Sequence, residues 1–296
     1  MRPFRWLLVA ALLAGCGGAA KEKPKDKDWT KMEYAWAPHE QPRARDLVPT
    51  ASQSENVLLK GATVMTATSE PITNGWVWLK DGRIAAVSAS KIDAKGATIV
   101  DAKGKFITPG LIDTHSHLGV YPTPYAGAHS DGNEATSPAT PQVDAVHSVW
   151  PQDPGFQAAV RGGVTALQIL PGSANLVGGN GVTVQLHPGI SARAMLFPGA
   201  PKGLKMACGE NPKRVYGGKG GSPSTRMGSM ATWRATFLAA EQYRRGIDDH
   251  VEAMKRWMAA AEQKPEAKPK TPPRDLGMET LVAAMAGTTL VHVHCY

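Results

Sequence analysis

Short apolar runs, interrupted by glycine turns, dominate the chain from residue 56 to residue 108. The runs NVLLKGATVMTA, GWVWLKDGRIAAVS and ATIVDAKGKFITPG are broken by Asp-Gly and Lys-Gly pairs. Apolar runs of this length, separated by such pairs, are typical of strands joined in hairpins. We therefore expect residues 56–108 to form a β-rich segment that carries no chemistry.

From residue 109 onward, apolar runs alternate with stretches of helical spacing. Helices are predicted at 156–163 and 224–262, and a further helix begins at 278. Strand-like runs occupy 164–170, 182–186 and 288–296, and the segment 203–211 contains a further apolar strand end. Residues 120–153 form a long polar segment, and a loop of this length is often a lid or a substrate wall.

Two histidine pairs stand at the ends of apolar runs. His115 and His117 end the run that begins at residue 106, and His292 and His294 end the last run of the chain. Strand side chains alternate between faces, so the two imidazoles of each pair point the same way. Neutral imidazoles on one face can hold one ion of a borderline metal such as Zn²⁺. The pattern therefore predicts a metal site.

The string PGLIDTHSH at 109–117 resembles the first-strand signature of the amidohydrolase superfamily, and the surrounding chain resembles its imidazolonepropionase-like branch. The match extends from about residue 56 to residue 296 and includes GGVT at 162–165. The resemblance implies an α/β fold with a TIM-type (β/α)₈ barrel. Residues 109–296 would form its first five strands, preceded by a small β-sandwich segment at 56–108.

The resemblance also implies a carboxylate that bridges two metal ions, because a carboxylate balances two cations and shares its two oxygens. In the superfamily this group is a carboxylated lysine or a glutamate near the third or fourth strand. The segment GLKMACGEN contains both Lys205 and Glu210. Glu210 is favoured because GENPK resembles the motif of this branch, and Lys205 is the alternative.

For the fifth strand, the resemblance implies a ligand at the carboxyl end. We choose His294, with His292 as the alternative, so the predicted metal ligands are His115, His117, Glu210 and His294. The family's sixth-strand histidine and eighth-strand aspartate, the general base, have no counterpart before Tyr296. Five strands cannot close a barrel, and open edges leave backbone groups unpaired. We expect the 296-residue chain alone to be poorly stable and catalytically impaired.

The first fifteen residues have the pattern of a secretory leader. Arg2 and Arg5 precede an apolar core that is too short to span a membrane. The string LAGC resembles the bacterial lipobox, which implies cleavage before Cys16 and lipidation of its thiol; an ordinary signal peptide is the alternative. Gly17, by resemblance to sorting in Gram-negative bacteria, implies anchoring in the outer membrane of the cell envelope, facing the periplasm. Residues 16–55 would then be the lipidated cysteine and a tether.

Charge and cysteine content add two constraints. The formal net charge is +8, and residues 201–275 contain 15 Lys or Arg against 8 Asp or Glu. This charge favours a solvated basic insertion over a nucleic-acid partner, because aromatic residues do not alternate with the charges. If Cys16 is lipidated, Cys208 and Cys295 can form at most one disulfide, and the sequence does not decide whether they meet.

These features together predict a lipid-anchored, metal-dependent hydrolase. One or two divalent ions, with zinc expected, would activate water to cleave an amide, cyclic amide or dipeptide-like C–N bond in a small molecule. The alternative is a truncated, non-catalytic lipoprotein that binds a metal or a ligand. The substrate and the oligomeric state are not indicated by the sequence.

Overall fold

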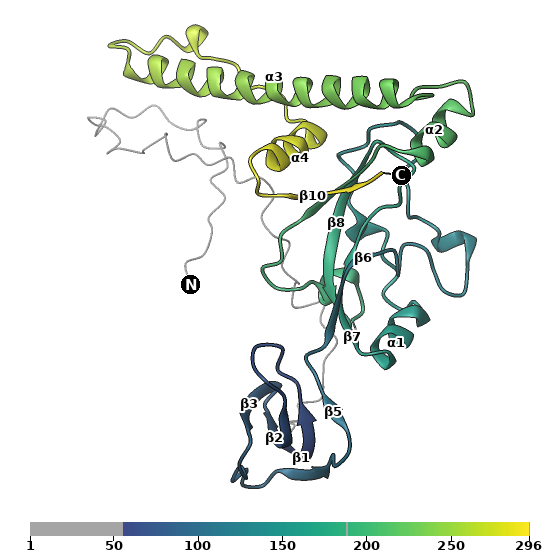
Figure 1. Cartoon of the computed structure of the whole chain (residues 1–296). Helices are drawn as coiled ribbons and strands as arrows, with labels where there is room; N and C mark the ends of the chain where they lie inside the picture. The colour runs from purple at the N-terminus through teal and green to yellow at the C-terminus, as the bar shows by residue number, and fades with distance from the viewer. Residues whose placement is uncertain (1–55, 188, 296) are drawn as a thin grey trace. The chain divides into compact units, whose positions relative to one another are not determined.

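The computed structural model describes residues 56–187 and 189–295. The predicted signal peptide at 1–15, the lipidated Cys16 and the tether at 16–55 lie outside these residues. The described part is an α/β structure with two five-stranded sheets (Figure 1). No helix within it is long and apolar enough to cross a bilayer.

The first sheet occupies the predicted β-rich segment. Its strand order is β3-β2-β1-β4, and β5 also pairs with β1. Asp81 and Gly82 have positive φ angles of 51° and 70°, as a two-residue hairpin turn between β2 and β3 requires. Strands β1 to β5 form a single sheet. The prediction of a β-rich segment at 56–108 is therefore confirmed, and the expected β-sandwich is not. The strands are β1 (Asn56–Val64), β2 (Ile72–Lys80), β3 (Arg83–Ser88), β4 (Thr98–Asp101) and β5 (Phe106–Ile107).

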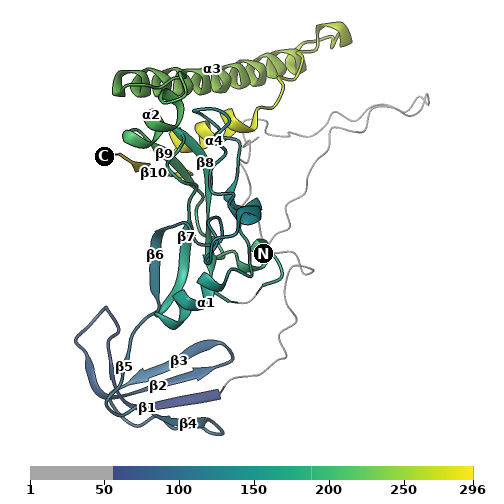
Figure 2. The same ribbon diagram turned by 90° about the vertical axis from the view of Figure 1, so that its right-hand side faces the viewer.

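The second sheet is a curled half-barrel with the strand order β10-β9-β8-β7-β6 (Figures 1 and 2). Parallel pairing joins β6 to β7 and β9 to β10. Both the order and the curl fit the predicted partial barrel. The strands are β6 (Leu111–Ser116), β7 (Val164–Ile169), β8 (Val177–Gln185), β9 (Gly203–Ala207) and β10 (Leu290–His294).

Strand β8 departs from the parallel barrel that the family resemblance implies. It runs antiparallel to both β7 and β9. The connection from β7 to β8 covers only residues 170–176, and a parallel crossover needs about a dozen residues or more. The short connection therefore forces the chain to reverse, and the all-parallel expectation is wrong for this strand.

The four α-helices within residues 56–187 and 189–295 include all three predicted ones. The N-termini of α1, α3 and α4 carry side-chain caps. Asp153 accepts from the backbone N–H of Gly155 before α1, and Thr225 accepts from that of Gly228 before α3. Helix α2 was not predicted. The helices are α1 (Pro154–Arg161), α2 (Glu210–Gly217), α3 (Arg226–Ala259) and α4 (Leu276–Met285).

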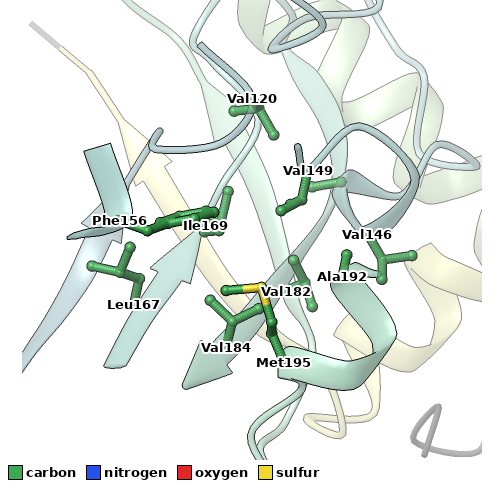
Figure 3. Close-up of a cluster of buried hydrophobic side chains, with 11 residues drawn as sticks. Val120, Val146, Val149, Phe156, Leu167, Ile169, Val182, Val184, Ala192 and Met195 are labelled. Atoms are coloured by element: carbon green, nitrogen blue, oxygen red, sulfur yellow. The ribbon is translucent and has the colours of Figure 1, made fainter. Parts of the chain in front are cut away.

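Two apolar clusters hold the second sheet to its neighbours. In one, Phe156 of α1 and Met195 lie among side chains of β7 and β8 (Figure 3). In the other, Leu204 and Met206 of β9 pack against Ala240 of α3 and against α4. Since strand side chains alternate, Lys205 lies on the face of β9 opposite these helices.

Candidate metal centre

Three predicted histidines meet where β6 and β10 end. The ring centroid of His115 is 5.3 Å from that of His117 and 5.9 Å from that of His294. These two strands are opposite edges of the sheet, and in a flat sheet they would lie about 19 Å apart. The curl of the half-barrel therefore brings the first and last strands together and gathers the three imidazoles.

Hydrogen bonds at Nδ1 orient two of these rings. The Nδ1 atom of His117 lies 2.8 Å from the backbone oxygen of Leu170, which can only accept, so Nδ1 carries the proton. The Nδ1 atom of His294 lies 2.5 Å from the hydroxyl of Ser173. An imidazole held at Nδ1 can present Nε2 to a metal.

The surroundings favour the neutral form of the imidazoles of His115 and His117. Burial lowers the pKa of His115, and the nearby Lys205 lowers it further. Burial also lowers the pKa of His117, although the hydrogen bond to Leu170 acts in the opposite direction. Metal binding requires unprotonated imidazole, so both shifts prepare the site for a cation near neutral pH.

Lys205 lies beside the histidines without any exposed surface (0%). Its Nζ donates to the backbone oxygen of Pro171 at 2.9 Å and to the hydroxyl of Ser173 at 3.2 Å. Burial lowers the pKa of Lys205 to about 8. A buried lysine with a perturbed pKa next to three histidines marks a functional-site candidate.

Glu210 and His292, the other two predicted candidates, lie differently. Glu210 is the first residue of α2; its side chain is 62% exposed and its Oε1 is 3.7 Å from Nε of Arg214. His292 pairs in register with Lys205, and its Nε2 is a buried atom without a hydrogen-bond partner in the described structure. The structure thus groups His115, His117 and His294 with Lys205, while the assignment of Glu210 as a ligand stays a prediction.

The donor set fits a divalent metal in chemistry and nearly in spacing. Two imidazoles that share one zinc ion have centroids about 5 Å apart, because each Zn–N bond is about 2 Å. The separation between His115 and His117 is close to this value, and that between His115 and His294 is wider. Among the described residues, no group of three or more His, Cys, Asp or Glu side chains is arranged so that it could hold a metal ion.

The long loop after β6 covers part of the site. The ring of Tyr121 meets the His117 ring edge-on with centroids 5.8 Å apart, and Asn133 donates to the Tyr121 hydroxyl. Asp131 and Glu134 are among the residues that line a cavity of about 410 Å³. The lining of this cavity includes none of the three histidines or Lys205, so a role of the loop as a lid or a substrate wall stays a prediction.

Cys208 and Cys295 form a disulfide in the structure. Cys208 directly follows β9 and Cys295 directly follows β10, and their Cα atoms are 5.0 Å apart. The bridge ties the strand of Lys205 to the strand of His294, which resolves the pairing that the sequence left open.

Ser173 is a site residue that was not predicted from the sequence. Its hydroxyl contacts both Lys205 and His294. The only available signal was its position after a barrel strand, where functional residues of such barrels gather.

No protein-family model matches the sequence. The chain is 36% identical over 265 residues to the protein named amidohydrolase tasK of Hapsidospora irregularis, a match that covers 81% of this chain and 26% of that protein. It is 30% identical over 128 residues to a dihydroorotase of Pelotomaculum thermopropionicum, covering 43% of this chain and 24% of that enzyme.

A solved structure of an amidohydrolase from Thermotoga maritima aligns with a TM-score of 0.67 and 38% identity. The alignment covers 80% of this chain and 57% of the solved chain. The chain therefore spans about a quarter of the length of these two curated relatives and somewhat more than half of this solved one.

Proposed function

The chain belongs to the amidohydrolase superfamily, and from this premise we propose that it provides the metal centre of a hydrolase acting on amide or related C–N bonds in small molecules. The observation that carries the proposal is the convergence of His115, His117 and His294 from opposite edges of the sheet. The names of the relatives, amidohydrolase and dihydroorotase, support the reaction class.

His115, His117 and His294 would hold one or two divalent ions, with zinc expected. A bound ion would polarise the substrate carbonyl and lower the pKa of water at the site. The protein's own contribution is to favour the unprotonated imidazoles of His115 and His117 and to fix the rings of His117 and His294 at Nδ1. The loop that carries Tyr121 and Asn133 would limit the access of bulk water.

Lys205 is favoured over Glu210 as the source of a bridging carboxylate. With a pKa of about 8, roughly a quarter of Lys205 is a neutral amine at pH 7.5. A neutral Nζ can attack the carbon of CO₂: an N–C bond forms, one C=O π bond opens, and the nitrogen releases a proton. The product is a carbamate anion at the buried position beside the histidines, whereas Glu210 faces Arg214.

Export and lipid anchoring at Cys16 belong to the same proposal. They are supported by the leader pattern, and the Cys208–Cys295 disulfide agrees with an oxidising compartment. Labelling of cells with a palmitate analogue would test the anchor: the unaltered chain would take up label and Cys16→Ser would not. Label retained by Cys16→Ser would remove this part of the proposal.

The test of the proposed function is metal stoichiometry. The purified chain, loaded with zinc and passed through a desalting column, is expected to retain one or two equivalents by elemental analysis. His115→Ala/His117→Ala would lose them, whereas the control His129→Ala/His250→Ala, with both substitutions outside the three-histidine cluster, would not. Absence of metal in the unaltered chain contradicts the proposal. Metal without turnover on amide substrates would instead favour the non-catalytic alternative.

A further inference from the structure

We propose that Ser173 is a positioning residue that connects Lys205 to His294 and sets the metal affinity of the centre. This inference rests on the proposed metal-dependent function. It concerns a residue that lies outside the predicted ligand set and that no strand pattern identifies.

The geometry around the Ser173 hydroxyl carries the inference. Its Oγ lies 2.5 Å from Nδ1 of His294 and 3.2 Å from Nζ of Lys205. Ser173 comes from the connection between β7 and β8, Lys205 from β9 and His294 from β10. One hydroxyl therefore joins three successive parts of the half-barrel at the point where the ligands gather.

A hydroxyl suits this place because its oxygen can accept two hydrogen bonds. In the metal-free chain the Lys205 ammonium only donates, so Ser173 accepts from Lys205. When His294 uses Nε2 for a metal, Nδ1 carries a proton, and the second lone pair of Ser173 can accept from it. An alanine methyl offers neither interaction, so the His294 ring would lose its hydrogen bond to the Ser173 hydroxyl.

The backbone holds Ser173 in position from both sides. The carbonyl of Pro171 accepts from Lys205, the N–H of Gly172 donates to the Gly132 carbonyl at 2.7 Å, and that of Ala174 donates to Oδ1 of Asn133 at 3.0 Å. At Gly172 a Cβ atom would collide with the side chain of Asn133. The hydroxyl is thus placed by a turn that is fixed to the loop after β6.

The two anchored rings differ in a way that makes the inference testable. His117 is held by the backbone carbonyl of Leu170, which a substitution at that residue retains. His294 is held by a side chain, which a substitution can remove. Loss of such an outer-sphere partner typically lowers metal affinity 10- to 100-fold.

The experiment compares the metal dissociation constants of the 296-residue chain and its variants, titrated with Zn²⁺ and Co²⁺ against a chromophoric chelator. Ser173→Ala is expected to bind 10- to 100-fold more weakly, and Ser173→Thr, which keeps the hydroxyl, within about threefold of the unaltered chain. Ser148→Ala, a substitution outside this hydrogen-bond network, is the control and should not differ. Equal affinity of Ser173→Ala and the unaltered chain would overturn the inference.

Two further measurements separate a failure of the inference from other failures. If the circular dichroism spectrum shows that Ser173→Ala is unfolded, Ser173→Thr and Ser173→Val are compared instead, because their side chains are nearly equal in shape. Equal metal affinities of these two variants would overturn the positioning role of Ser173. If the unaltered chain binds no metal, the proposed function fails. The ¹⁵N shifts of the His294 ring then decide the positioning role: a change in metal-free Ser173→Ala supports it, and identical shifts overturn it.

Discussion

A lysine side chain with no exposed surface normally needs a compensating partner. Among the described residues, Lys205 donates to two neutral acceptors, the Pro171 carbonyl and the Ser173 hydroxyl. Its charge also contributes to the lowered pKa of His115, His117 and His292. At the residue scale, Lys205 therefore links the stability of the metal-free chain to the protonation of the site.

Lys205 should make the stability of the metal-free chain depend on pH. Its pKa is lowered from 10.5 to about 8 on folding, so between these values the unfolded chain binds a proton that the folded chain does not. Stability then rises with pH in this window, and the cost of burying the charge is fully present below pH 8. Relative to Lys205→Met, the free energy of unfolding of the unaltered chain should rise by about 3 kcal/mol from pH 7 to pH 10.5. Urea titrations in CO₂-free buffer with a chelator would measure this difference. Parallel pH profiles of the two proteins would contradict it.

Substitution of the two candidate bridging residues should separate their roles. Lys205→Ala is expected to lower the amount of bound zinc by about one equivalent per chain, because the bridging carboxylate is lost. Glu210→Gln should leave the stoichiometry unchanged, since its exposed side chain faces Arg214. Elemental analysis of both variants decides between them, and the opposite result would restore Glu210 as the bridging group.

Whether a site residue can be predicted depends on the sequence separation between that residue and the residues that it contacts. The pairing of His115 with His117 can be read from the alternation of one strand. The contact of Ser173 with His294 spans 121 residues, so no local pattern contains it. Glu210 matched a family motif, but the chain enters α2 at that residue and the carboxylate lies on an exposed helical turn.

At the scale of elements, the sequence predicted the strand-rich segment at 56–108 and helices α1, α3 and α4, because each has a clear period or good caps. It did not predict α2 or the reversed direction of β8. The direction could have been inferred from the connection at 170–176, which is too short for a parallel crossover. The fold of the first segment as one sheet depends on long-range pairing, which periodicity does not encode.

The disulfide between the ends of β9 and β10 should stabilise the chain considerably. It closes a loop with a sequence separation of 87 residues, for which the loss of unfolded-state entropy corresponds to about 4–5 kcal/mol. Reduction with a phosphine should lower the free energy of unfolding by an amount of this order, measured from urea midpoints. Cys208→Ser/Cys295→Ser should already show the lower stability and should not respond to the reductant. A response in the double variant would mean that the bridge is not the source.

At the scale of the whole molecule, the second sheet has two edges with exposed apolar side chains. On β10, Val291 is 46% and Val293 is 51% exposed, and on β6 both Leu111 and Ile112 are exposed. Val291 and Val293 pair in register with Leu204 and Met206 of β9, which are buried under α3 and α4. The helices therefore cover β9 but leave Val291 and Val293 exposed, which gives an apolar surface on the edge strand β10.

Such an edge should cause the 296-residue chain to self-associate, since exposed strand edges with apolar side chains are templates for pairing. Sedimentation velocity is expected to show association that increases with protein concentration. Val291→Lys/Val293→Lys should raise the concentration needed for association at least about tenfold, because charges on an edge strand oppose pairing.

Leu238→Lys, on an exposed part of α3, is the matched control and should behave as the unaltered chain. If the control suppresses association equally, net charge and not the β10 edge is responsible. If the unaltered chain sediments as a monomer at all concentrations, this edge does not drive association, and the predicted poor stability of the chain must be sought within its folded part.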